Sequence, residues 1–166
     1  MKKLLLVVVM LIGCITIQAQ KKISVEVSAG LTYPMKSQVG DKAIGPAFTL
    51  EGRYNVGGGL DVGLQAYYGD VLNSYGNSKV HHKSIAGLVV ADYNIGLVPS
   101  FTPFIGAGVG YGGLIESYQD AEEKEKGMHY MLRLGVEHKS HVRLTLYGRM
   151  GKEYFASYGV SIGYAF

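Results

Sequence analysis

Cysteine is almost missing from this chain, which has only Cys14 among 166 residues. A single thiol cannot form an intramolecular disulfide, and it cannot supply the cysteine pairs that structural zinc sites use. The sequence therefore excludes a disulfide framework and a cysteine-based metal site. No metal and no cofactor is expected.

Long apolar runs are missing after residue 20. A transmembrane helix needs roughly 18 or more consecutive apolar residues. The best candidate, Ile85 to Val98, is interrupted by Asp92 and Asn94. If the mature protein meets a membrane, it must therefore do so with β-strands.

A large excess of positive charge is also missing. The chain has 16 Lys and Arg against 13 Asp and Glu, and loss of Lys2 and Lys3 with a signal peptide would leave 14 against 13. Proteins that bind nucleic acids usually carry a concentrated basic surface. No nucleic-acid partner is therefore expected.

The N-terminus has the organisation of a secretory signal peptide. A basic start and an apolar run, Leu4 to Ile17, precede a small residue at Ala19. An alternative stays open, because Leu11 to Cys14 resembles the lipobox of bacterial lipoproteins, in which the cysteine becomes lipidated. We predict a signal peptide over residues 1–19 and a single barrel domain over residues 20–166.

The rest of the chain favours strands over helices. It contains 24 Gly, a poor residue for helix interiors, and 13 Tyr, which favours strands. Eight segments alternate apolar with small or polar residues, at the period of two that is typical of a β-strand. These segments are Ile23–Tyr33, Ala47–Tyr54, Leu60–Tyr68, His82–Asn94, Pro103–Gly112, Met128–His138, Val142–Met150 and Tyr158–Phe166.

The links between these segments alternate in length. Short links span residues 55–58, 95–102 and 139–141, and longer polar loops are expected at 34–45, 69–80 and 113–127. Short turns at one end and long loops at the other are typical of outer-membrane barrels. The pattern predicts an all-β fold, an eight-stranded antiparallel up-and-down transmembrane β-barrel. Its last strand pairs with its first, so that no edge stays open.

The less apolar face of the strands carries the charges, and a barrel would turn this face inward. A charge on the lipid face costs about 2–4 kcal/mol near the membrane midplane. The predicted lumen charges are Glu26, Glu51, Arg53, Asp61, Asp92, Arg133, Glu137, Arg143 and Arg149. Because side chains just fill an eight-stranded barrel, we expect a packed polar network, with a proton or ion path as the alternative. Gly106, Gly108 and Gly110 would make room for arginines from neighbouring strands.

Two aromatic rings are expected at the ends of the apolar band, because tyrosine combines an apolar ring with a polar tip. The ring at the loop side would contain Tyr33, Phe48, Tyr68, Tyr111, Tyr130 and Tyr158. The ring at the turn side would contain Tyr54, Tyr93, Tyr164 and Phe166.

The histidines invite a catalytic interpretation. The spacing of His138 and Ser140 is similar to a motif of outer-membrane lipid A deacylases, which use a serine nucleophile and a histidine base. In that family Asn and Ala follow the serine, whereas His141 and Val142 follow here. The strand count also places these residues at a periplasmic turn, away from the outer leaflet that holds the substrate. We therefore assign no catalytic residue.

The alternating strands, the segment TPFIGAGVGYG and the terminal Phe166 together resemble the small OmpA/OmpX-like outer-membrane β-barrel proteins. This resemblance implies a Gram-negative-type outer membrane, a periplasmic N-terminus and external loops. It also implies that the C-terminal strand is the signal for the barrel assembly machinery, through Tyr158, Val160, Ile162, Tyr164 and Phe166. Further implied partners are periplasmic chaperones and outer-membrane lipid, including lipopolysaccharide.

Three functions stay open. The leading hypothesis is a non-enzymatic membrane protein whose loops mediate surface interaction or whose barrel supports envelope integrity. The second hypothesis is a narrow pore for ions or small solutes, and the third is a lipid A-modifying hydrolase.

Overall fold

A computed structural model describes residues 22–35, 44–75, 78–96, 100–118, 121–151 and 156–166. Within these ranges only the backbone is described at residues 72–75, 78–81, 116–118 and 121–123. The predicted signal peptide, including Cys14, lies outside the described residues.

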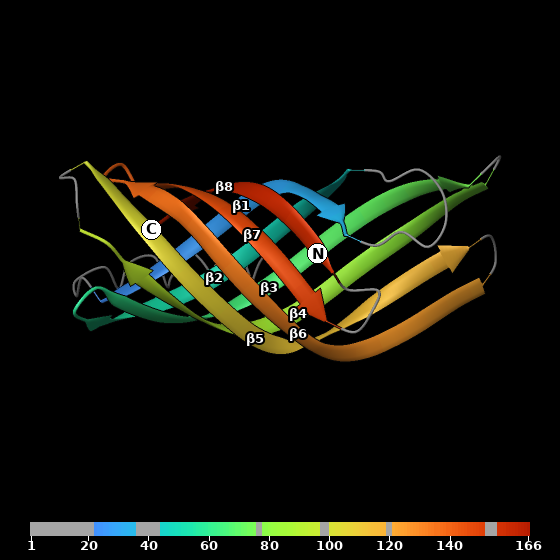
Figure 1. Cartoon of the computed structure of the whole chain (residues 1–166), viewed down its shortest axis with the longest axis horizontal. Helices are drawn as coiled ribbons and strands as arrows, with labels where there is room; N and C mark the ends of the chain where they lie inside the picture. Colours follow the sequence, from blue (N-terminus) through green and yellow to red (C-terminus); the bar gives the residue numbers. More distant parts are fainter. Residues whose placement is uncertain (1–21, 36–43, 76–77, 97–99, 119–120, 152–155) are drawn as a thin grey trace, which may run out of the picture.

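Eight strands close into a barrel (Figure 1). They are β1 (Ile23–Pro34), β2 (Gly45–Gly57), β3 (Leu60–Tyr75), β4 (Ser78–Asn94), β5 (Phe101–Tyr118), β6 (Ala121–His138), β7 (Val142–Gly151) and β8 (Ser157–Ala165). Each strand pairs antiparallel with the next, and β8 pairs with β1. The predicted fold is therefore confirmed. A membrane-spanning helix is absent from the described residues.

The C-terminal strand is fully paired. Its register with β1 runs from Glu26 opposite Ala165 to Pro34 opposite Ser157. Beyond β8, the Phe166 N–H donates to the Val25 carbonyl at 2.8 Å. This pairing removes the open edge that a terminal strand would otherwise expose.

The ends of the barrel differ in their connections. At the short-turn end, Gly57, Gly58 and Gly59 join β2 to β3 with φ angles of 108°, 62° and 83°, which glycine adopts without steric cost. The β6–β7 turn at this end places His141 at φ 67°, and its N–H donates to the His138 carbonyl at 2.8 Å. The opposite end, at the right of Figure 1, is the long-loop end.

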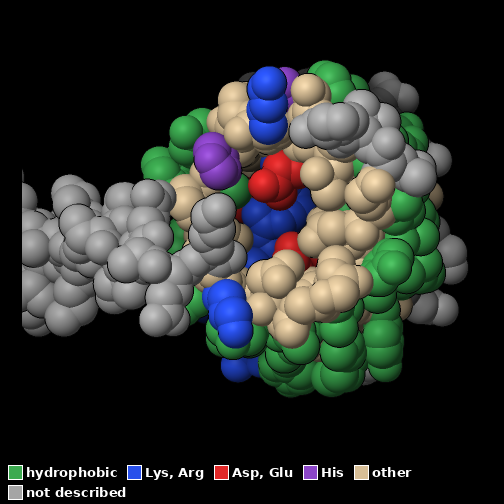
Figure 2. All heavy atoms as spheres, turned by 90° about the vertical axis from the view of Figure 1, so that its left-hand side faces the viewer, with side chains coloured by type: hydrophobic (Ala, Val, Ile, Leu, Met, Phe, Trp, Pro, Cys, Tyr) green, Lys and Arg blue, Asp and Glu red, His purple; other side chains and the backbone are tan. Residues whose placement is uncertain are grey.

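Side chains alternate strictly between the two faces of the barrel wall. Outward residues are apolar and exposed, as at Leu64 with 69% exposure, whereas the inward Arg143 is 1% exposed. Figure 2 looks into the short-turn end, with hydrophobic side chains around the outside and charged side chains in the centre. An apolar outer surface of this extent requires an apolar surrounding.

Aromatic side chains gather near both ends of the apolar band. At the long-loop side, Tyr33 and Tyr158 are register partners whose ring centroids lie 5.0 Å apart. At the short-turn side, the rings of Tyr164 and Phe166 lie 4.9 Å apart. Phe101, which the sequence analysis did not include, adds a contact with the His138 ring at 4.8 Å.

The predicted loops at residues 69–80 and 113–127 were wrong in extent. β3 and β4 stay paired as far as Tyr75 and Ser78, and β5 and β6 stay paired as far as Tyr118 and Ala121. Most of both segments is therefore strand. Both segments are rich in charged and polar residues, so the regular apolar alternation that revealed the other strands is missing there.

Candidate functional site

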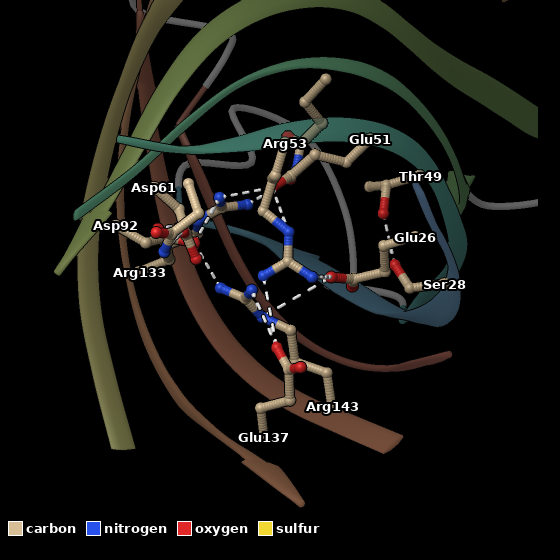
Figure 3. A network of polar contacts seen from close by, with 12 residues as sticks. Glu26, Ser28, Thr49, Glu51, Arg53, Asp61, Asp92, Arg133, Glu137 and Arg143 are labelled. Carbon is tan, nitrogen blue, oxygen red and sulfur yellow. Dashed lines mark hydrogen bonds and ion pairs between the residues drawn. The ribbon is translucent and has the colours of Figure 1, made fainter. Parts of the chain in front are cut away.

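The lumen near the short-turn end holds a connected set of seven charged residues, which we call the lumen network (Figure 3). Its members come from five strands and comprise Glu26, Glu51, Arg53, Asp92, Arg133, Glu137 and Arg143. All seven were predicted to face inward. With every group ionised, it contains four carboxylates and three guanidinium groups.

Arg133 ties opposite walls of the barrel together. It donates to both oxygens of Glu51, with Nη2 at 2.7 Å from Oε1, and to both oxygens of Asp92 at 2.8 Å. Arg133 lies on β6 and Glu51 on β2, which are four strands apart in the closed barrel. Paired charge-assisted hydrogen bonds of this kind are the strong and directional ones, so the guanidinium acts as a crossbar through the lumen.

Arg53 and Arg143 complete the lumen network. Arg53 lies 3.1 Å from Glu26 Oε2 and 3.4 Å from Glu137 Oε2. Arg143 contacts the same two carboxylates at 3.6 and 3.5 Å, and it also bonds Asp92. Each carboxylate therefore meets at least two guanidinium groups, which compensates the cost of burying it.

The strand register explains why these arginines are needed. Glu26 stands directly opposite Glu51, and Asp61 stands directly opposite Asp92. Like charges in cross-strand positions repel each other. Arg53, within 3.6 Å of Glu51 and 3.1 Å of Glu26, lies between the first pair.

Small inward residues leave space for this packing. A Cβ on Gly106 would overlap Asp92 Oδ1, so this glycine admits the Asp92–Arg133 pair. Gly108 and Gly110 were also expected to admit arginines, but the atoms nearest to them belong to apolar side chains or to the backbone. Gly108 lies against Val90 and Met131, and the atoms closest to Gly110 belong to the backbone of Gly87 and Leu88.

Gly135 supports the ring beneath Arg143. The Arg143 guanidinium stacks 3.5 Å from the centroid of Phe104. A Cβ on Gly135 would lie 2.6 Å from Phe104 Cζ and would also meet the Leu144 carbonyl. We predict that Gly135→Ala lowers the free energy of unfolding by about 1–3 kcal/mol, because the Phe104 ring and the Leu144 backbone must both shift.

Gly148→Ala is the matched control for that substitution, since nothing lies within 4 Å of its added methyl group. It is expected to change stability by less than about 0.5 kcal/mol. Denaturant titration of both variants in the same detergent measures the difference. Equal stability of the two variants would contradict the predicted packing.

Arg149 lies apart from the lumen network, one layer toward the long-loop end. It is 1% exposed and stacks 3.5 Å above the Tyr67 ring. Its Nη2 lies 3.5 Å from His129 Nδ1. The contacts described for Arg149 include no carboxylate, so this arginine is held mainly by cation–π stacking.

Asp61 also lies apart, near the short-turn mouth. Its two oxygens accept hydrogen bonds from Asn55 Nδ2 at 2.6 Å and Asn94 Nδ2 at 2.7 Å. These hydrogen bonds stabilise the Asp61 carboxylate, although the amides carry no charge of their own.

The long-loop half of the lumen is less polar than expected. Inward residues of β4 there are apolar and pack with two tyrosines and a methionine from other strands. This cluster comprises Ala47, Tyr67, Ala86, Leu88, Val90, Met131 and Tyr147. A cavity of about 20 Å³, enough for roughly one water molecule, lies between Arg133 and Arg149 and is also lined by Gln65.

The histidine and serine of the deacylase-like spacing do meet. His138 Nδ1 lies 2.7 Å from Ser140 Oγ, at the exposed β6–β7 turn of the short-turn end. The bonds described there include no carboxylate that would orient the ring.

Three contributors to the lumen were overlooked in the sequence because they are uncharged or aromatic. Gln65 Nε2 donates to Glu51 Oε2 at 2.8 Å, and Phe104 and Tyr67 carry the stacked guanidinium groups. The signal that would have found them was present. Gln65, Phe104 and Tyr67 all occupy inward-facing positions in the period-two alternation, as the charged residues of the lumen do.

The family of this barrel follows from its sequence. A profile described as the outer membrane protein beta-barrel domain matches residues 5–166. The chain belongs to this family. The outer membrane is therefore the location of this barrel, and its apolar surface faces lipid. No curated protein matches the chain in sequence.

Solved structures agree with this assignment at the level of the fold. Neisserial surface protein A is 16% identical with a TM-score of 0.65, over 86% of this chain and 95% of that one. The N-terminal β-barrel domain of Pseudomonas aeruginosa OprF is 17% identical, with a TM-score of 0.55 and coverages of 86% and 97%. The attachment invasion locus protein Ail of Yersinia pestis is 13% identical, with a TM-score of 0.55 and coverages of 89% and 100%. At these identities the similarity extends to the fold alone.

Proposed function

We propose that this outer membrane barrel is a non-enzymatic protein whose lumen is closed and whose external strands and loops mediate surface interaction or support the envelope. The observation that carries the proposal is the crossbar of Arg133 between Glu51 and Asp92, which spans the lumen from β2 to β6 and β4. An ion would have to break these buried pairs in order to pass.

The lengths of the strands support a role outside the membrane. β5 and β6 each have 18 residues, whereas β7 has 10 and β8 has 9. With the short turns in the periplasm, the surplus length of β3 to β6 projects from the outer surface. Outer-membrane lipid, including lipopolysaccharide, is the proposed partner nearest to these strands.

The C-terminal strand fits the proposed role in assembly. Its five alternating residues, Tyr158, Val160, Ile162, Tyr164 and Phe166, are all exposed on the lipid-facing side. We propose that periplasmic chaperones and the barrel assembly machinery recognise this apolar stripe before the barrel closes.

The hydrolase hypothesis receives less support than the closed barrel. His138 and Ser140 lie in contact, but they lie at the periplasmic turn in the proposed orientation. The pore hypothesis has a direct test. In planar bilayers the purified barrel is expected to give no single-channel steps, while a porin in the same apparatus gives clear ones.

Reproducible steps that change amplitude in Glu51→Gln would contradict the closed lumen, because Glu51 lies within the proposed seal. Steps that are insensitive to this substitution would indicate leakage around the protein. Steps whose amplitude changes in Glu51→Gln would favour the narrow-pore hypothesis over the closed barrel.

A further inference from the structure

The small cavity in the lumen lies between the lumen network and Arg149. Its volume is about 20 Å³, and it is lined by side chains from β1, β2, β3, β6, β7 and β8. Glu26 and Arg133 in this lining belong to the lumen network, whereas Arg149 stacks on Tyr67. A polar cavity of this size has room for roughly one water molecule, and an apolar one stays dry. The polar atoms of the lining therefore decide what the cavity can hold.

Three side chains of the lining carry a buried polar atom that has no hydrogen-bond partner among the described residues. These atoms are Glu26 Oε2, Gln65 Oε1 and Arg149 Nε. The three residues are only 5%, 7% and 1% exposed, so bulk water does not reach these atoms. Buried polar atoms in folded proteins nearly always have a partner. The three atoms therefore require a partner that the described part of the chain does not supply.

The chemistry of the three atoms defines this partner. Gln65 Nε2 donates to Glu51 Oε2 at 2.8 Å, which fixes the amide orientation and leaves Oε1 as an acceptor. Glu26 Oε2 lies 3.1 Å from Arg53 Nη2 as an ion pair, yet it accepts no hydrogen bond. Arg149 Nε can only donate, because a guanidinium stays protonated. The missing partner must therefore donate twice and accept once.

The charges around the cavity disfavour an ion of either sign. An anion would lie against the Glu26 carboxylate and the Gln65 carbonyl oxygen, which are both acceptors. A metal cation would lie against the guanidinium groups of Arg133 and Arg149. Neutral hydroxyl groups add to the polar lining, at Ser28, Thr49, Thr145 and Ser161. A small neutral molecule with two donors and an acceptor fits this lining best.

We propose that the cavity binds one structural water molecule, which donates to Glu26 Oε2 and Gln65 Oε1 and accepts from Arg149 Nε. Three hydrogen bonds are typical of a buried water molecule. This water joins Arg149 to Glu26, and through Glu26 to the rest of the lumen network. The inference does not depend on which end of the barrel faces outward, or on whether the lumen conducts.

Crystals of the unchanged barrel grown in rubidium bromide test the site directly. We expect one solvent peak at hydrogen-bond distance, about 2.5–3.2 Å, from all three atoms. Anomalous scattering identifies either ion, and we expect no anomalous signal at this peak. A bromide signal would show an anion site, and a rubidium signal would show a cation site. Either signal, or a cavity without a solvent peak, would overturn the proposal.

A pair of substitutions tests the bridge in solution. Gln65 and Arg149 share no described hydrogen bond, but both hold the proposed water. We expect Gln65→Met and Arg149→Met together to shift the guanidinium midpoint of unfolding by less than the sum of the two single shifts. The reason is that either substitution alone already removes one of the three bonds of the water.

Asp61→Asn with Arg149→Met is the matched control pair. Asp61 lies at the short-turn mouth and outside the lining of the cavity. The shifts of this pair are expected to add, because the two sites share no partner. Additive shifts in the first pair, or the same departure from additivity in both pairs, would contradict the bridging role of the water.

Discussion

Replacing Arg133 with methionine is expected to lower the free energy of unfolding by about 3–5 kcal/mol, the cost of breaking a buried ion pair from one side. Arg133 holds Glu51 and Asp92 with hydrogen bonds to both oxygens of each carboxylate. Without it, these carboxylates share the two remaining arginines of the lumen network. Methionine keeps an unbranched apolar stem and removes the charged guanidinium group, so the loss reports mainly on the broken ion pairs.

Two further variants separate charge from packing. Arg149→Met removes another buried arginine whose described contacts include no carboxylate, and it should cost about 2 kcal/mol, the order of a desolvated cation–π contact. The double variant Glu51→Gln with Arg133→Met should recover part of the loss, because one fewer uncompensated carboxylate stays buried. Guanidinium titrations of reversibly folded protein in lipid vesicles give these values. Equal losses for Arg133→Met and Arg149→Met would contradict the role assigned to the lumen network.

Replacing Leu134 with arginine is expected to cost about 2–4 kcal/mol, the penalty for arginine on the lipid face near the midplane. Leu134 is 55% exposed and pairs in register with Ile105 and Leu146, two exposed apolar residues. The substitution therefore places a charge in the middle of the apolar band. It leaves the lumen untouched, because the side chain points away from it.

Met128→Arg is the matched control for Leu134→Arg. It lies on the same face of the same strand, six positions closer to the outer rim, or about 20 Å along the strand. Arginine near the membrane interface costs only about 0–1 kcal/mol. The same vesicle titrations compare the two variants. A cost that does not depend on position would mean that this face does not meet lipid as proposed.

The alternation of residue types was enough to predict which way most side chains point. Along β7, for example, Arg143, Thr145 and Tyr147 were expected inward and Leu144 and Leu146 outward, and the structure places them so. This succeeds because successive side chains of a strand point to opposite sides, and lipid and lumen demand different chemistry. Closure of β8 on β1 followed from the even number of strands.

The alternation of residue types could not predict which charged side chains pair with each other inside the lumen. Arg133 and Glu51 are 82 residues apart in sequence and meet across the barrel. Their contact depends on how far neighbouring strands are staggered, and that stagger is set by the whole closed sheet. The alternation of inward and outward positions identified the charged residues of the lumen, but it did not identify the partner of each one. Asp61 and Arg149 accordingly share the inward parity, yet they lie outside the lumen network.

The extent of the outer strands was missed for a related reason. Leu114 and Ile115 belong to a segment expected to be a loop, although β5 continues to Tyr118. Beyond Ile115 the sequence is dominated by charged and polar residues, so no apolar alternation marks a strand there. Backbone pairing continues to the end of this hairpin, where Tyr118 pairs with Ala121.

Tryptophan fluorescence offers the most direct test of the central claim that adjacent residues of one strand face lipid and lumen in turn. The chain has no tryptophan of its own, so single substitutions at Leu146, which is 51% exposed, and Tyr147, which is 8% exposed, can each be read without background from other tryptophans. In vesicles of phospholipid brominated at mid-chain, Leu146→Trp is expected to be strongly quenched, and Tyr147→Trp is expected to keep nearly the intensity it shows in unbrominated lipid. Equal quenching of the two, or the reverse order, would contradict the barrel described above.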